Sequence, residues 1–148
     1  MDGFLSRVIG IVLIFLGLVV SPLINVLGNQ EMEDRIAVLN ATSEFLDKQA
    51  DKRSITDDDL NEFYLNVSSH GMVLDVKVQR LVKTAVKAPD GTINTTYIAA
   101  DNMNALNNGD IIQVHIEEVS TTLYRKMLHA FLRIDEKKYK LDRAKYVR

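Results

Sequence analysis

The chain has 148 residues, a formal net charge of −2 and no cysteine, which excludes a disulfide scaffold and a thiolate metal site. Its charge is unevenly distributed: residues 1–30 are neutral overall, residues 31–120 carry a net −8, and residues 121–148 carry a net +6. Together with hydropathy, this pattern predicts three parts. They are a transmembrane helix over 1–30, an α+β head over 31–134, and a basic tail over 135–148.

The first part contains a long uncharged stretch, from Val8 to Gln30. An α-helix needs about 20 apolar residues to cross a bilayer core, and Val8 to Gly28 supplies that length. The apolar region of a secretory signal is shorter and follows a clearly basic start, whereas this chain has only Arg7 there. We therefore expect a retained membrane helix. Cleavage near Gly28, which would release a secreted soluble domain, is the alternative.

Small residues recur along one stripe of this stretch. Gly10, Gly17 and Ser21 fall on the same helical side, and Pro22 removes one helical hydrogen bond and predicts a kink. Small residues allow close approach of helix backbones in lipid, so the stripe predicts self-association or packing into a larger bundle. The simpler interpretation is that glycine and proline are common in membrane helices.

The orientation of the helix follows from its flanking charges. Arg7 lies before the apolar stretch, and Glu31, Glu33 and Asp34 lie after it. Positive charge favours the cytoplasmic side, so we expect the N-terminus inside and the head outside. This predicts a single-pass membrane protein, with a cell-surface filament as one form of that location.

Two helices are expected next. Apolar residues from Met32 to Leu46 follow helical spacing, which predicts that the membrane helix continues to about Asp51. Thr56 is a plausible N-cap for a second helix that closes near Gly71. The three aspartates at 57–59 complement the positive end of that helix, and they lack the alternating spacing and central glycine of a calcium loop.

Alternating patterns then predict three strands, which begin at Leu74, Ile93 and Ile112. Pro89-Asp90-Gly91 supplies the turn between the first two, because proline presets φ and glycine accepts a positive φ. The expected fold class is α+β. We expect a small head in which helices pack on one face of a three-stranded antiparallel meander.

The last helix of the sequence is amphipathic and basic. Ser120 or Thr121 is its expected cap, and its apolar stripe is formed by Leu123, Met127, Phe131 and Ile134. Such a helix either covers a sheet, which we favour, or lies on an anionic membrane surface. For the basic tail we expect solvation, or docking to the acidic middle of another copy, rather than nucleic-acid binding.

No pattern for chemistry is apparent. The three histidines lack metal-ligand spacing, and the nucleophile, phosphate-loop and dinucleotide motifs are missing. We therefore expect no enzyme activity, no cofactor and no metal. The charged residues with the best prospects of docking to other chains are Glu31, Glu33, Asp34, Arg125, Lys126, Arg133, Lys137 and Lys138.

Two segments carry a family resemblance. They are ITDDDLNEFYLNVSSHGMVLDVKV at 55–78 and NNGDIIQVHIEEVSTTLYRKMLHAF at 107–131. With the apolar first helix, they resemble the TadE-like, pseudopilin-like proteins of Tad (tight adherence, Flp) pilus systems. The resemblance implies a subunit or accessory of an extracytoplasmic filament, whose apolar helix packs among those of other pilin-like subunits.

The leading functional hypothesis is thus a non-enzymatic structural or assembly subunit of a bacterial envelope filament. Its partners would be further copies or other pilin-like subunits, together with the lipid bilayer. Two alternatives stay open at this point. One is a membrane-tethered binding or accessory module of a secretion or conjugation complex, and the other is the secreted domain left after signal cleavage.

Overall fold

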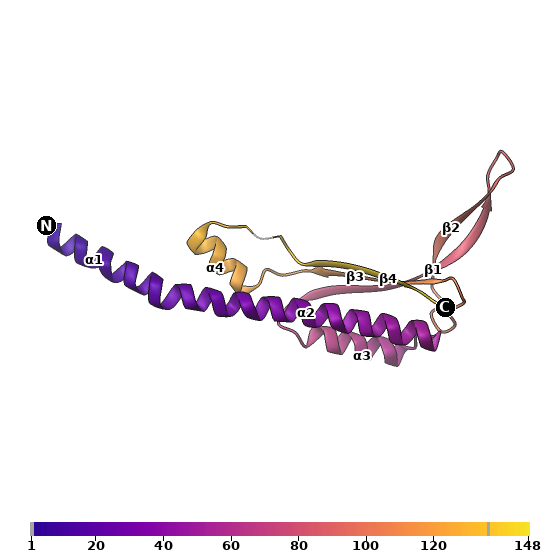
Figure 1. Cartoon of the computed structure of the whole chain (residues 1–148), viewed down its shortest axis with the longest axis horizontal. Helices are drawn as coiled ribbons and strands as arrows, with labels where there is room; N and C mark the ends of the chain where they lie inside the picture. The colour runs from indigo at the N-terminus through magenta and orange to yellow at the C-terminus, as the bar shows by residue number, and fades with distance from the viewer. Residues whose placement is uncertain (1, 136) are drawn as a thin grey trace. The chain divides into compact units, whose positions relative to one another are not determined.

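The computed structural model describes residues 2–135 and 137–148, and it divides the chain into two compact units. We call residues 1–34 with 121–137 the N-terminal unit, and residues 35–120 with 138–148 the sheet unit. Each is described by itself. The elements in chain order are α1 (Asp2–Phe15), the π-helix η1 (Leu16–Val20), α2 (Ser21–Lys52), α3 (Asp57–Ser68), β1 (Leu74–Lys87), β2 (Ile93–Ala100), β3 (Ile111–Glu118), α4 (Leu123–Leu132) and β4 (Lys140–Tyr146) (Figure 1).

Residues 2–52 form one helical stretch, with a π-turn just before Pro22. The backbone N–H of Ser21 donates to the carbonyl of Leu16, five residues back, and α2 then continues through Pro22 to Lys52. Proline offers no N–H and its ring collides with the carbonyl four residues earlier, so a locally wider turn accommodates it. The kink predicted at Pro22 stays a prediction, and the structure adds a π-turn that precedes the proline.

The sheet has four antiparallel strands in the order β2-β1-β3-β4, which corrects the predicted three-stranded meander. β1 lies between β2 and β3, so the second strand does not separate the first from the third. The fourth strand comes from Lys140–Tyr146, which pairs with β3 from Ile111↔Tyr146 to Glu117↔Lys140. The predicted basic tail is thus an edge strand, and its lysines and arginine suit an edge that must not pair further.

β1 is long because its two halves pair with two different strands. Its first half, Leu74–Leu81, pairs with β3, and its second half, Arg80–Lys87, pairs with β2. The second half therefore projects with β2 as a two-stranded arm (Figure 1). The turn at its tip follows the prediction, since Gly91 has φ 88° and its N–H donates to the carbonyl of Ala88 at 2.9 Å.

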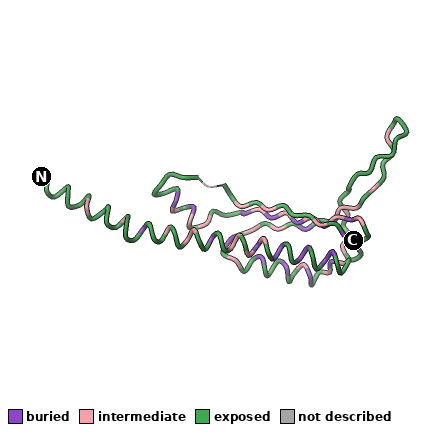
Figure 2. Tube along the Cα trace, in the orientation of Figure 1, coloured by how far each residue is buried: buried purple, intermediate pink, exposed green. Residues whose placement is uncertain are grey.

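The core of the sheet unit lies between helices and one face of the sheet, which confirms the predicted α+β arrangement (Figure 2). Along β3, Ile112, Val114 and Ile116 are fully buried, whereas the alternate residues are half-buried. Phe45 of α2 and Phe63 of α3 stack in this core with ring centroids 4.2 Å apart.

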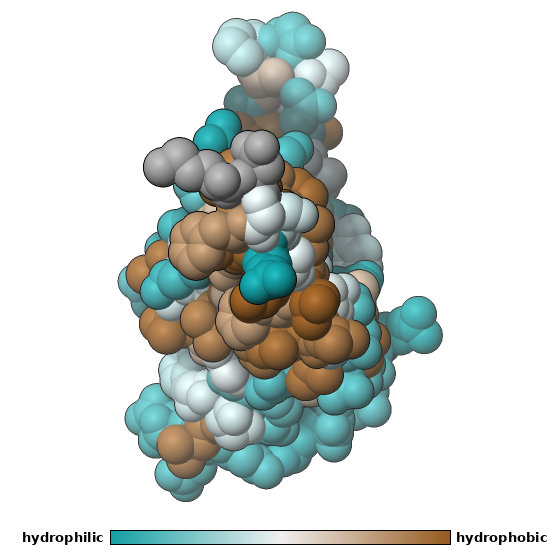
Figure 3. Space-filling model, turned by 90° about the vertical axis from the view of Figure 1, so that its left-hand side faces the viewer, coloured by the Kyte–Doolittle hydropathy of each residue, from teal (hydrophilic) through white to brown (hydrophobic). Residues whose placement is uncertain are grey.

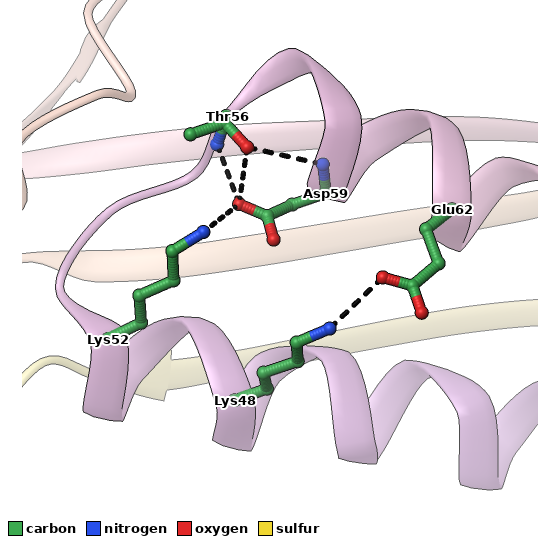
Figure 4. A network of polar contacts seen from close by, with 5 residues as sticks. All are labelled: Lys48, Lys52, Thr56, Asp59 and Glu62. Carbon is green, nitrogen blue, oxygen red and sulfur yellow. Dashed lines mark hydrogen bonds and ion pairs between the residues drawn. The ribbon is translucent and has the colours of Figure 1, made fainter.

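A polar network fixes the entry into α3 (Figure 4). Thr56 caps the helix as predicted, because its hydroxyl accepts from the N–H of Asp59 while the Asp59 carboxylate accepts from the N–H of Thr56 at 2.9 Å. Lys52 of α2 also donates to that carboxylate, at 2.6 Å. These donors, the lysine first, lower the pKa of Asp59 well below its ordinary value. A second pair joins Lys48 and Glu62 at 3.0 Å, at the exposed surface.

Candidate functional site

The apolar start of the chain is a helix with almost no partner inside the structure. The stretch Gly3–Lys52 contains an 18-residue window apolar enough to cross a membrane, and only 6% of that window is buried. Such exposure distinguishes it from the core helix of a water-soluble domain. A membrane anchor and a signal sequence both fit this length and composition. Apolar side chains dominate this end of the molecule in the space-filling view (Figure 3).

The predicted packing stripe lies on open surface. A Cβ added at Gly10 or Gly17 would meet no heavy atom within 4 Å, and Ser21 and Pro22 are exposed. Within the described residues, nothing in the monomer occupies this side of the helix. The stripe is therefore available to lipid or to another helix.

A buried cluster joins α2 to α4 in the N-terminal unit. We call it the Glu31 cluster: Glu31, Thr122 and Arg125. One Glu31 carboxylate oxygen accepts from Nε and Nη2 of Arg125 at 3.0 and 2.8 Å, and the other accepts from the hydroxyl of Thr122. Glu31 and Arg125 are only 5% and 4% exposed. The cluster makes a two-donor, charge-assisted contact between residues 94 apart in the sequence.

Thr122 performs two tasks in this cluster. Its hydroxyl also accepts from the N–H of Arg125 at 3.4 Å, so Thr122 is the N-cap of α4. The cap was predicted one or two residues earlier, at Ser120 or Thr121. The difference arises because the tertiary contact with Glu31 selects which hydroxyl lies at the helix start.

Close approach of the two helices depends on a glycine next to the cluster. A Cβ at Gly28 would lie 3.0 and 3.1 Å from two ring carbons of Tyr124, closer than side chains ordinarily tolerate. Gly28 thus acts as a contact surface for the aromatic ring. The sequence indicates this glycine only as the end of the apolar stretch and the neighbourhood of a possible cleavage site.

α4 turns its predicted apolar stripe outward. Arg125 and Leu128 are buried, whereas Leu123, Phe131 and Leu132 are 61%, 49% and 55% exposed. The favoured interpretation, in which α4 covers the sheet, stays a prediction. Within the N-terminal unit, the buried side of α4 contacts α2 at Gly28 and Glu31. The charge of Arg125 misled the sequence argument, because a buried arginine with a carboxylate partner reverses the apparent faces of a short helix.

The eight candidate docking charges have different fates. Glu31 and Arg125 are consumed in the buried pair, so they are not docking charges. Lys138 donates to the carbonyl of Val119 at 3.0 Å, and Asp34 is half-buried. Five of the eight are exposed: Glu33, Lys126, Arg133, Lys137 and Lys138.

A second buried ion pair, in the sheet unit, was not predicted. Nε and Nη2 of Arg80 on β1 lie 2.8 and 2.6 Å from Oδ2 of Asp110, and Nη1 donates to the carbonyl of Asn102. Asp110 also accepts from the N–H of Asn107. The alternation of β1 could have revealed it, since Arg80 falls on the same parity as the core residues Val76 and Val78.

The two-stranded arm is exposed on both faces (Figure 2). Its exposed apolar side chains are Val86, Ile93, Tyr97 and Ile98, with exposed fractions of 46%, 71%, 37% and 50%. A two-stranded ribbon gains little from packing on its own. The arm is therefore an accessible apolar surface of the sheet unit.

Comparison with known proteins adds no family: no family model, no curated protein and no solved structure matches the chain. Among the described residues, no group of three or more His, Asp or Glu side chains could hold a metal ion. His115 contacts Asp142 and His129 lies 3.6 Å from Asp135, and both histidines lie at the surface. The features that bear on its function are the apolar helix, the Glu31 cluster and the exposed surfaces.

Proposed function

We propose that this chain is a non-enzymatic, single-pass membrane subunit of a multi-subunit bacterial envelope assembly, with a pilus-like filament as its specific form. The observation that carries the proposal is the N-terminal helix, whose apolar side chains are largely exposed and whose Gly10 and Gly17 have open space beside them among the described residues. The resemblance of residues 55–78 and 107–131 to pseudopilin-like proteins of Tad systems supports the filament form.

In this mechanism the helix partitions into the bilayer and then exchanges lipid contacts for contacts with other helices. Gly10, Gly17 and Ser21 allow the backbones to approach, so dispersion forces between closely packed helices favour association. The N-terminus stays in the cytoplasm and the sheet unit lies outside, in line with Arg7 before the helix and the acids after it.

Outside the membrane, the sheet unit supplies surfaces for neighbouring subunits. The arm has exposed apolar residues. The β4 edge carries basic side chains, whereas residues 31–120 are acidic overall. Complementary charge sets which edges meet and in what register. An array in which one copy's basic edge faces another copy's acidic surface uses both features.

Substitution within the stripe tests the proposal. Gly17→Leu places a bulky side chain where two helices must approach, so we expect the cross-linked oligomer in membranes and mild detergent to fall several-fold. Val19→Leu is the matched control, because Val19 lies on the opposite side of the same turn and is 49% exposed. Circular dichroism checks that both variants fold. Equal oligomer yields for wild type and Gly17→Leu would count against helix packing.

Copy number and mass separate the alternatives. N-terminal sequencing and intact mass of the native protein, from membranes and from sheared surface material, should show a chain that keeps residues 8–28. Recovery in sheared material as a repeating array supports the filament. One or two copies per complex indicates a tethered accessory module, and a chain that begins near Asn29 indicates a secreted domain.

A further inference from the structure

The outward face of α4 is a second exposed apolar surface of the N-terminal unit, beside that of the membrane-type helix. Leu123, Phe131 and Leu132 of α4, with Ile134 just after it, are all about half exposed or more. Thr122 caps the start of this helix and Arg133, with φ 54°, ends it. A short, well-bounded helix thus displays apolar side chains away from the element that holds it.

The position of α4 along the apolar stretch is set by its contacts. Tyr124 packs on Gly28 and Arg125 binds Glu31, so the helix starts where the uncharged stretch Val8–Gln30 ends. Within 3–28 the buried residue is Val20, on the same side of the helix as Gly28 and Glu31.

If residues 8–28 occupy the hydrocarbon, the height of Glu31 is the outer boundary of the bilayer. A helix pinned there, with an apolar outer side, meets the headgroup and acyl boundary rather than bulk water. The exposed cations Lys126 and Arg133 border the apolar residues, where they can reach lipid phosphates, and His129 with Asp135 completes the polar side.

We propose that α4 is an interfacial helix: its outer apolar side chains lie in the outer leaflet of the lipid bilayer, and the Glu31 cluster fixes it to the membrane helix. The occupant of the exposed face is lipid, because that face continues the lipid-facing surface of the helix that it packs on. The inference rests on the proposed membrane anchoring. It adds a second membrane contact, which fixes the rotation and tilt of the subunit in the bilayer.

Because the chain has no cysteine, a single introduced cysteine can be labelled to measure its depth in the bilayer. The full chain, with the single substitution Phe131→Cys, is spin-labelled and reconstituted in vesicles of phosphatidylcholine and phosphatidylglycerol in equal parts. Accessibility of the label to oxygen, which concentrates in lipid, is compared with accessibility to a water-soluble nickel chelate. Leu13→Cys reports the membrane helix, and Ile93→Cys, on the arm, reports water.

We expect the Phe131 label to resemble the Leu13 label, with an oxygen-to-nickel ratio several-fold above that of the Ile93 label. A water-like Phe131 label beside a lipid-like Leu13 label overturns the inference and leaves the anchor intact. Shielding of Phe131 from both reagents, with spin–spin broadening between copies, also overturns it, because another subunit then covers the face. A water-like Leu13 label removes the anchor, and the proposed function fails with the inference.

Discussion

In the sheet unit, fifteen buried apolar side chains form one contiguous core, whereas the buried apolar residues described in the N-terminal unit are Val20 and Leu128. Both units nevertheless contain a buried arginine–carboxylate pair, Arg80–Asp110 in the first and Glu31–Arg125 in the second. The two ion pairs are therefore alike in chemistry but lie in different surroundings. In the sheet unit the pair sits at the margin of a large core, and in the N-terminal unit it is the main internal contact.

The two units therefore differ in the source of their folding free energy. The sheet unit gains stability by removing apolar surface from water. The described residues of the N-terminal unit leave most of their apolar side chains exposed, and the Glu31 cluster is a buried polar contact between its two helices. Substitutions in the apolar core and in the buried ion pairs should therefore behave differently in the two units.

The largest effect is expected from Arg80→Ala. It leaves the carboxylate of Asp110 buried without its ion-pair partner, which costs about 3–5 kcal/mol in the free energy of unfolding. Urea unfolding followed by circular dichroism, on the full chain in detergent micelles, measures it. The matched control is Lys48→Ala, which removes an exposed ion pair with Glu62 and should cost about 0–1 kcal/mol. Equal losses in the two variants would show that burial of the Arg80 pair is unimportant.

Truncation of the central strand should come next. Ile116→Ala creates a cavity at a fully buried position and should cost about 2–5 kcal/mol. Ile93→Ala makes the same chemical change on the arm, where the side chain is 71% exposed, and should stay within about 0.5 kcal/mol of wild type. The same unfolding experiment compares them. A large loss in Ile93→Ala would reveal that the arm is covered in the protein as prepared.

Arg125→Ala should act locally. Without the guanidinium, the helix can leave α2 so that Glu31 regains water, and trypsin should then cleave after Lys126 about tenfold faster or more, equivalent to about 1.4 kcal/mol of lost protection. The urea unfolding of the sheet unit should change by less than about 0.5 kcal/mol.

The control for that experiment replaces both partners. Glu31→Leu with Arg125→Met exchanges the ion pair for apolar side chains of similar size, which is often neutral or stabilising. Slow cleavage should return in the double variant. If cleavage stays fast there, the specific polar contact holds α4 in place, and burial of similar volume cannot substitute for it.

The smallest effect is expected from Asp59→Asn, about 1 kcal/mol at neutral pH, through loss of the capping box. The donors Lys52 and Thr56 lower the pKa of Asp59 in the folded state, so its contribution is complete above the ordinary value of 3.8 and is lost as pH falls below it. The difference between wild type and variant should therefore shrink in acid. Asp58→Asn, at an exposed position of the same turn, is the control. A constant difference down to low pH would contradict the role of the Asp59 carboxylate.

Local signals in the sequence were sufficient for several elements. The cap at Thr56 was predictable because the threonine and the acidic first turn of α3 act within one helical turn. The turn at Pro89-Asp90-Gly91 was predictable for the same reason, since its backbone demands are met by the residues themselves. The long apolar helix followed from composition alone.

β4 and the Glu31 cluster were not predictable in this way. The segment Lys140–Tyr146 lacks a clean alternation, and it becomes a strand because β3 offers an unpaired edge. Glu31 and Arg125 looked like surface charges because nothing nearby in the sequence marks either as buried. Their partnership joins positions 94 residues apart, and only the folded chain brings them together.

The sequence by itself determined an apolar membrane-type helix, an α+β class and the turns and caps that depend on neighbouring residues, because these follow from short-range sterics and from the transfer of apolar residues out of water. The tertiary structure decided the strand order, the fourth strand, the projecting arm and the outward face of α4. Those features depend on which distant groups pair through hydrogen bonds and charges when water is excluded. The periodicity of the sequence does not reveal such long-range pairing.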